Sequence, residues 1–340
     1  MSDEREELIT FPFLFMGIEK LDQTENHHKV HQHVLERREK WFRNRKVLEG
    51  SSIANATPGR RKSIKSWRIF SYTIGFFNFF LKFFFLLNRG KRNSLHCQVR
   101  LQDHIFHHIP DNFNGLTILQ ISDLHLQEDP TLIKRIISLV NGLSVDVIAF
   151  TGDFTTKSVK VLSDEEIVSR LQELIKVVRP KVGSFGVMGN HDHAELAEQL
   201  ENVGIKMLIN EAVDLVREGQ SIRLVGTDDP HYYFTRDSIS ALKTASEKFT
   251  IAMVHSPELF DMASKLGVDF YLCGHTHGGQ VCLPGGVPVL THLNAGKRFF
   301  RGAWFINGMR GYTSTGVGTV ALPVRFNVRG EVVLHFCRKA

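Results

Sequence analysis

Short apolar runs alternate with helical patterns along the C-terminal two thirds of the chain. Runs rich in Val, Ile and Phe occur at 116–122, 145–152, 184–190, 222–227, 249–256, 268–275, 318–326 and 331–336. Helical periodicity at 164–178 and 194–203 separates some of these runs, and beyond Gly278 only strand and turn patterns remain. This alternation predicts an α/β domain from Gly115 onward, with two facing sheets flanked by helices rather than one parallel sheet.

The N-terminal third has a different pattern and predicts two further regions. Residues 24–49 form a polar helical pattern, so residues 1–50 are expected to be a helical N-terminal region. Gly, Ser, Asn and Pro at 50–60 indicate a linker. A basic, Phe-rich segment then occupies residues 51–95 and is expected to anchor the protein to a membrane.

The Phe-rich run at 69–87 carries the membrane prediction. Seven of the 26 Phe lie between residues 75 and 87, and the polar positions fall on one helical stripe: Ser71, Gly75, Asn78 and Lys82. Basic residues flank the run on both sides, which is typical of a helix that lies in the membrane interface. Two alternatives stay open: a spanning helix, since 19 residues approach the ~20 required, and an amphipathic helix packed on the catalytic domain or on a partner subunit.

The distribution of charge along the chain also supports binding to a membrane. Residues 1–100 hold 19 Lys and Arg against 10 Asp and Glu, whereas residues 101–340 hold 23 against 26. Because the positive charge is confined to the region that is also the most apolar, we expect a membrane lipid surface rather than nucleic acid as the partner. The acidic start is not expected to be a signal peptide. Four dispersed cysteines favour a reducing compartment and argue against a structural zinc site.

Five of the apolar runs end in side chains that commonly bind metal ions. Asp123 and His125 follow the first run, and because strand side chains alternate they would face the same way. Each block alone has an ordinary explanation, such as an Asp that caps a helix or a His in the core. Five such blocks at strand ends indicate a metal site instead. The candidate ligands are Asp123, His125, Asp153, Asn190, His255, His275 and His277.

The block Gly189-Asn190-His191-Asp192 adds two residues without a ligand role. His191 is a candidate for acting on the substrate. Asp192 is expected to orient His191 or to support the ligands from behind.

Together the motifs SDLH, TGD, GNHD, VHSP and GHTHGGQ resemble the calcineurin-like metallophosphoesterase superfamily over residues 113–340. The resemblance implies a four-layer α-β-β-α sandwich of two mixed sheets, here preceded by the N-terminal helical, membrane-binding region. It implies one metal ion on Asp123, His125 and His277, another on Asn190, His255 and His275, and a bridging Asp153. It also implies that His191 contacts the phosphate and acts as the acid.

The implied cofactors are two divalent metal ions. Carboxylate, imidazole and amide ligands without thiolates suit Mn²⁺, which we expect here, and also Fe, Co or Zn. Two ions about 3.5–4 Å apart can activate water and stabilise the attacking and leaving oxygens of an in-line displacement. A neighbouring His that supplies a proton typically contributes ~10²–10⁴-fold.

Finer motifs suggest a substrate. GTDDP at 226–230 and the tail TSTGVGTVALPVRF resemble the membrane-associated branch with YkuE-like and YaeI-like proteins, which includes the chlamydial-type UDP-2,3-diacylglucosamine pyrophosphatases. We therefore expect hydrolysis of UDP-2,3-diacylglucosamine in lipid A biosynthesis at the cytoplasmic face of a bacterial inner membrane. Arg310, in an Arg-Gly pair, is a candidate contact for a substrate phosphate, and an ordinary surface Arg is the alternative.

Three other functions remain open from the sequence. A membrane-associated phosphodiesterase or phosphatase of broader specificity would use the same ligands. A non-catalytic scaffold recruited to the membrane would not require His191. A nucleic-acid hydrolase is favoured only by the pI of about 9.1.

Overall fold

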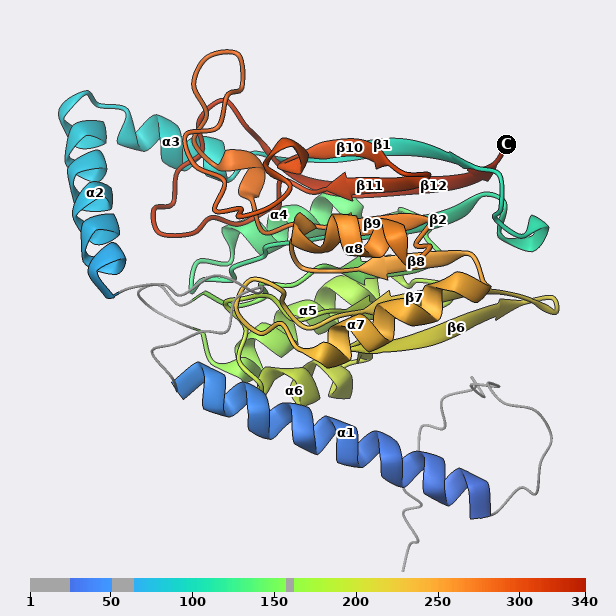
Figure 1. The fold of residues 1–340 in the computed structure, drawn as a ribbon. Coiled ribbons are helices and arrows are strands. Elements are labelled where there is room, and N and C mark those ends of the chain that lie inside the picture. Colours follow the sequence, from blue (N-terminus) through green and yellow to red (C-terminus); the bar gives the residue numbers. More distant parts are fainter. Residues whose placement is uncertain (1–24, 51–63, 157–161) are drawn as a thin grey trace, which may run out of the picture. The chain divides into compact units, whose positions relative to one another are not determined.

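The strands of the chain form two six-stranded sheets (Figure 1). The computed structural model describes residues 25–50, 64–156 and 162–340. The linker expected at 50–60 therefore lies outside the described residues, except for its first residue. The chain divides into two compact units, Met1–Trp41 and Phe42–Ala340, and both sheets belong to the second unit.

The first sheet is mixed and has the strand order β1-β12-β2-β3-β4-β5. Its strands are β1 (Cys97–Phe106), β12 (Gly330–Lys339), β2 (Leu116–Ile121), β3 (Val147–Phe150), β4 (Gly183–Gly186) and β5 (Ile205–Met207). The four strands from β2 to β5 run parallel, whereas β12 is antiparallel to β2. The carboxyl ends of β2, β3 and β4 therefore meet at one edge.

The second sheet is also mixed and has the order β10-β11-β9-β8-β7-β6. Its strands are β10 (Gly302–Ile306), β11 (Met309–Thr313), β9 (Phe270–Cys273), β8 (Thr250–Met253), β7 (Gln220–Gly226) and β6 (Glu211–Arg217). Strands β11, β9, β8 and β7 run parallel, and the outer strands β10 and β6 run antiparallel to their neighbours. The prediction of two mixed sheets is confirmed.

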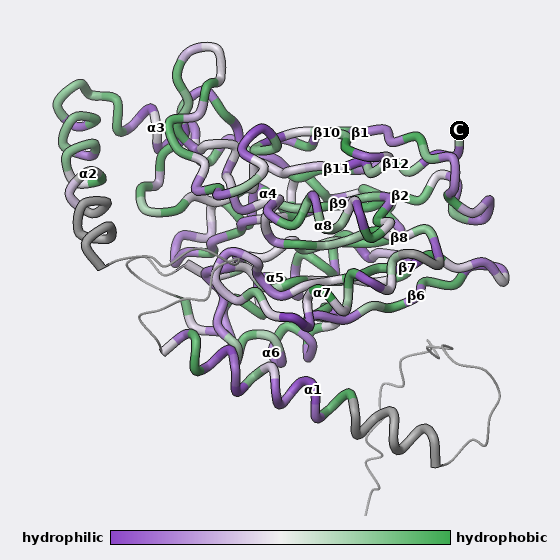
Figure 2. Tube along the Cα trace, viewed as in Figure 1, coloured by the Kyte–Doolittle hydropathy of each residue, from purple (hydrophilic) through white to green (hydrophobic). Residues whose placement is uncertain are grey.

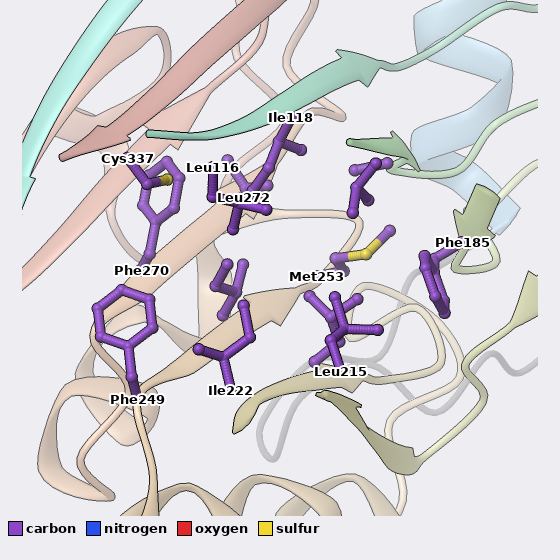
Figure 3. Packing of buried hydrophobic residues seen from close by; sticks show 14 of the residues in the cluster. Leu116, Ile118, Phe185, Leu215, Ile222, Phe249, Met253, Phe270, Leu272 and Cys337 are labelled. Atoms are coloured by element: carbon purple, nitrogen blue, oxygen red, sulfur yellow. The ribbon is translucent and has the colours of Figure 1, made fainter. Parts of the chain in front are cut away.

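The main apolar core lies between the two sheets (Figure 3). Leu116 and Ile118 of β2 belong to the same cluster as Met253 of β8 and Leu272 of β9. Alternate side chains of a strand point to opposite faces, so each sheet contributes one apolar face to this layer. The packed layer fixes the distance between the two sheets and so between the loops that follow their strands.

Helices cover the outer faces and complete the four layers. They are α4 (Thr131–Val140), α5 (Asp164–Val178), α6 (Leu196–Asn202), α7 (Arg236–Leu242) and α8 (Phe260–Lys265). Helix α5 has the bounds that its periodicity predicts, and Ser163 and Glu166 form a capping box at its start. A second apolar cluster joins α7 and α8 to the outer face of the second sheet. The sandwich prediction is thus confirmed.

Among the described residues before the sandwich, the structure contains the helices α1 (Glu25–Gly50), α2 (Ile64–Phe83) and α3 (Leu87–Ser94). Helix α1 is polar, as predicted, whereas the described part of α2 is largely apolar (Figure 2). The Phe-rich helix ends at Phe83 rather than at residue 87, because Phe85 adopts a left-handed backbone conformation. Among the described residues, no helix has the length and apolarity needed to cross a membrane.

Two parts of the sandwich differ from the sequence prediction. The run at 318–326 was expected to be a strand, but it forms a loop with only an isolated bridge between Val281 and Phe326. The run instead contributes the buried Arg325 side chain, whose guanidinium donates to the carbonyls of Thr315, Gly316 and Gly318. Strand β1, by contrast, lies before the expected domain start at residue 113. It is an edge strand whose polar residues alternate without a long apolar run.

Candidate metal centre

All seven predicted ligands lie in loops that follow the parallel strands. Asp123 and His125 follow β2, Asp153 follows β3 and Asn190 follows β4. His255 follows β8, and His275 and His277 follow β9 in the second sheet. Because these strands end at facing edges of the two sheets, their side chains converge. Each ligand is at most 7% exposed.

The backbone at five of these ligands is left-handed. The φ angle lies between 40° and 72° at Asp123, His125, Asp153, His275 and His277. A non-glycine residue seldom adopts this conformation, which costs of order 1–3 kcal/mol and is found where function requires it. The strained turns aim the side chains inward immediately after each strand ends.

The first group of ligands surrounds His125. Its Nε2 atom lies 3.2 Å from Nε2 of His277 and 3.4 Å from Oδ2 of Asp153. Asp123 Oδ1 lies 3.6 Å from His277 Nε2. Asp123, His125 and His277 therefore offer ligand atoms close enough to hold one cation.

The second group surrounds His255. Its Nε2 atom lies 3.1 Å from Oδ1 of Asn190 and 3.3 Å from Nδ1 of His275. The Asn190 oxygen is also 2.8 Å from His275 Nδ1. Asp153 Oδ2 lies 3.3 Å from His255 Nε2, so the same carboxylate oxygen that faces His125 also faces this group. Asp153 is thus positioned to bridge two cations.

The distances within each group fit metal coordination. Ligand atoms about 2.0–2.2 Å from an ion, arranged tetrahedrally or octahedrally, lie roughly 3–3.5 Å from one another. Backbone carbonyls also select the ring tautomers. Nδ1 of His125 faces the Thr155 carbonyl at 2.9 Å, and Nδ1 of His255 faces the Thr151 carbonyl at 2.8 Å. When these Nδ1 atoms donate, Nε2 of each ring keeps the lone pair that a metal requires.

The electrostatics of the cluster also favour cations. Burial and neighbouring imidazoles hold the pKa of His275 and of His277 well below the usual value, so both rings are neutral. Burial alone would raise the pKa of Asp153, but His255 and His191 hold it well below its usual value. Burial likewise opposes protonation of His255, yet the Asp153 carboxylate raises its pKa well above normal. The negative potential that draws a proton to His255 would draw a metal ion instead.

Asp192 is buried behind the ligands and joins two of their loops. Its carboxylate accepts hydrogen bonds from the backbone N–H groups of Asp153, Phe154, Thr155 and Gly189, at 2.8–3.1 Å. Asp192 therefore holds the loop after β3 against the loop after β4. These four hydrogen bonds are all to backbone N–H groups of the two loops.

His191 lies at the centre but is only partly buried. Its backbone N–H donates to Oδ1 of Asp153 at 2.8 Å, and its ring meets the His125 ring edge-on with centroids 4.8 Å apart. It is the one predicted site residue besides Arg310 that retains appreciable exposure. A ring beside the cluster that is open to solvent can reach a substrate.

The structure does not bring Arg310 to this centre, which corrects the sequence-based assignment. Arg310 pairs with Phe270 at the start of β9, whereas the ligands follow the end of that strand. Its Nε atom donates to the carbonyl of Ile105 at 2.7 Å. The Arg-Gly pair in the sequence could not reveal at which end of the strand the guanidinium would lie.

Two residues near the ligands were not assigned a role from the sequence. His231 is buried, its Nδ1 atom faces Oε2 of Glu258 at 3.1 Å, and its ring centroid lies 4.5 Å from that of His275. The GTDDP motif just before His231 was the available signal. Arg45, from α1, was missed altogether because nothing local distinguishes it from other basic residues of a polar helix.

Residues 116–279 match the model of the calcineurin-like phosphoesterase family. The chain is 30% identical over 242 residues to the uncharacterized metallophosphoesterase YkuE of Bacillus subtilis, which covers 66% of this chain and 80% of that protein. It is 27% identical over 235 residues to phosphodiesterase YaeI of Escherichia coli, covering 66% and 83%. A transmembrane protein with metallophosphoesterase domain from Danio rerio is 30% identical over 246 residues, covering 66% and 53%.

Proposed function

Because this chain belongs to the calcineurin-like phosphoesterase family, we propose that it hydrolyses a phosphodiester or pyrophosphate bond in a membrane lipid. The specific substrate that we propose is UDP-2,3-diacylglucosamine, cleaved to UMP and 2,3-diacylglucosamine 1-phosphate in lipid A biosynthesis. The observation that carries the reaction class is the position of Asp153 between the two ligand groups. Its Oδ2 atom lies 3.4 Å from His125 Nε2 in one group and 3.3 Å from His255 Nε2 in the other.

The residues divide between two metal positions. Asp123, His125 and His277 would hold one ion, Asn190, His255 and His275 would hold the other, and Asp153 would contribute to both. Two divalent ions, Mn²⁺ in our proposal, supply Lewis-acid activation of water and of the phosphoryl oxygens when bound. Fe, Co or Zn would also suit this donor set.

His191 supplies the proton in this proposal. Its ring is beside His125 and partly exposed, whereas the ligand imidazoles are buried. Proton donation to the leaving oxygen relieves the charge that develops as the bond to phosphorus breaks. The hydrogen bond from the His191 backbone to Asp153 keeps the ring beside the bridging carboxylate.

Exposed aromatic residues support a lipid substrate and a membrane surface as the partner. Phe76, Phe83 and Phe85 are 72%, 66% and 90% exposed, and basic residues accompany them. Burial of a Phe contributes up to roughly 1.5–3 kcal/mol, and each nearby Lys or Arg about 1 kcal/mol on an anionic leaflet. We infer that α2 lies in the interface at the cytoplasmic face of a bacterial inner membrane.

A broader-specificity membrane-associated phosphodiesterase is the second candidate. It is favoured by the similarity to phosphodiesterase YaeI and uses the same ligand set. A non-catalytic scaffold is the alternative of another class, and the complete ligand set argues against it. We expect no nucleic-acid partner, since the basic charge accompanies the exposed Phe residues.

Product analysis tests the substrate. Full-length protein in detergent with Mn²⁺ is incubated with UDP-2,3-diacylglucosamine in ¹⁸O-labelled water. We expect UMP and the lipid 1-phosphate in equal amounts, with ¹⁸O in UMP because water attacks the α-phosphorus. The His191→Ala variant should bind metal and release far less UMP.

Two other outcomes decide between the alternatives. Cleavage of a model diester without release of UMP would refute the lipid substrate and leave the broader phosphodiesterase. A protein that retains no metal by elemental analysis and cleaves neither compound would be the scaffold.

A further inference from the structure

Arg45 is a fully buried cation contributed by the last part of α1. The segment Phe42–Gly50 of this helix belongs to the same compact unit as both sheets. The Arg45 side chain is 1% exposed, although the residues beside it in the helix, Asn44 and Lys46, are exposed. Burial of a charge is costly unless every donor finds a partner. The hydrogen-bond partners of the Arg45 guanidinium therefore indicate the role of this residue.

Two of the partners are carbonyls on either side of the catalytic motif. The Nη2 atom donates to the Gly189 carbonyl at 2.9 Å and to the Asp192 carbonyl at 2.6 Å. Between these two carbonyls lie Asn190, a predicted ligand, and His191, the proposed acid. One guanidinium nitrogen thus holds both ends of the four-residue turn.

The opposite side of the same turn is held by the carboxylate of Asp192. That carboxylate accepts from the backbone of the loop after β3, which carries Asp153. The turn is therefore bound on its inner side to the bridging ligand's loop and on its outer side to Arg45. Without the Arg45 guanidinium, the turn would lose the hydrogen bonds to the carbonyls of Gly189 and Asp192.

The remaining contacts hold the guanidinium itself in place. Nη1 of Arg45 pairs with the buried Asp228, in the loop after β7, and Nε lies 3.1 Å from Oε1 of Glu49. The guanidinium also lies 3.8 Å from the centroid of the Tyr233 ring. Glu49 in turn accepts from the backbone N–H of Ala194 at 2.9 Å, just past the turn. Arg45 thus joins the loop after β4 to the loop after β7.

We propose that Arg45 is a positioning residue for the second metal position and for His191. It acts through the carbonyls of Gly189 and Asp192 and does not contact the substrate. The end of α1, outside the residues 116–279 that match the family model, is thereby part of the hydrolytic machinery. The inference rests on the proposed reaction class but not on the identity of the lipid substrate.

A positioning role predicts effects that a purely structural role does not. Loss of Arg45 should loosen Asn190 and so weaken metal binding at one of two positions. Supporting residues of this kind typically change metal affinity by about 10–100-fold. Displacement of His191 should lower kcat, because misplacement by ~1 Å can cost ~10²-fold. KM for a small diester should change little.

The test uses full-length Arg45→Met and Arg45→Lys, with Arg43→Met as the control on an exposed position of the same helix. Mn²⁺ binding is titrated by electron paramagnetic resonance, which requires no activity. Hydrolysis of bis(p-nitrophenyl) phosphate gives kcat and KM at saturating Mn²⁺. Circular dichroism and thermal unfolding identify the temperature range in which each variant is folded.

We expect Arg45→Met to bind one Mn²⁺ normally and the other about 10–100-fold more weakly. Its kcat should fall while KM stays near the wild-type value, and Arg45→Lys should recover part of both losses because it restores a buried cation. Folded Arg45→Met with wild-type Mn²⁺ binding and kcat would overturn the inference, as would equal losses in Arg43→Met. If the wild type binds two Mn²⁺ but cleaves no phosphoester, the proposed function fails, and the titration still tests the role of Arg45.

Discussion

Gly274 is the residue at which one added methyl group should disable the metal centre. It lies between the end of β9 and the ligand His275, and its backbone does not have a positive φ. Alanine is therefore compatible with the backbone itself. A Cβ atom at this position would lie 1.9 Å from Oγ of Ser122 and 2.3 Å from Oδ2 of Asp123.

The magnitude follows from these distances. Ordinary contact begins near 3.4 Å, so Asp123 Oδ2 and residue 274 must separate by about 1.1 Å. Asp123 cannot move freely, because Ser122 Oγ donates to it at 2.6 Å and the His275 backbone donates at 3.1 Å. Overpacking of this kind typically costs ~1–3 kcal/mol in stability. Misplacement of a ligand by ~1 Å should lower kcat/KM by ~10²-fold.

The assay compares Gly274→Ala with Gly75→Ala, a helical position where an added Cβ would meet none of the described residues within 4 Å. Hydrolysis of a model diester is measured at several Mn²⁺ concentrations, and bound metal is counted by elemental analysis. We expect Gly274→Ala to lose metal and activity and Gly75→Ala to retain both. Gly274→Ala with two bound ions and kcat/KM within a few-fold of wild type would refute the proposed ligand geometry.

Three further predictions concern stability and membrane binding. Burial, with Arg310 nearby, lowers the pKa of His104 from 6.5 to about 4, so protons favour the unfolded chain. His104 should therefore not affect the free energy of unfolding above pH ~6.5, and should lower it as the pH falls from ~6.5 towards ~4. Urea titrations at several pH values should show that the free energy of unfolding falls less steeply with pH in His104→Gln than in the wild type. Asp192→Asn should lower stability by about 1–3 kcal/mol, since one oxygen cannot replace a carboxylate that accepts four backbone N–H groups; an unchanged urea midpoint would contradict this. Replacement of the exposed Phe76, Phe79 and Phe83 by serine should abolish sedimentation with anionic vesicles, while hydrolysis of the model diester persists. Retained sedimentation would exclude α2 as the membrane anchor.

The central strands and the ligand motifs that follow them could be predicted from the amino-acid sequence. Each ligand immediately follows a strand whose apolar run is readable locally, and parallel strands necessarily bring their carboxyl ends to one edge. This rule accounts for Asp123 and Asp153, which follow neighbouring strands of one sheet, whereas the five motifs together predicted that His255, from the other sheet, would join them. Helix α5 was equally predictable, because its periodicity and its capping box at Ser163 are local signals.

The positions and partners of isolated polar residues could not be predicted, because they depend on contacts between distant parts of the fold. Arg45 lies 144 residues from Gly189, and its burial depends on carbonyls that no local pattern reveals. Arg310 occupies the far end of its strand, where its guanidinium binds Ile105, because strand register rather than motif sets its position. The loop at 318–326 has an apolar composition typical of a strand, but its neighbouring carbonyls solvate the buried Arg325 guanidinium. Long-range contacts of this kind arise from packing, so the same local sequence can be solvated in one fold and buried in another.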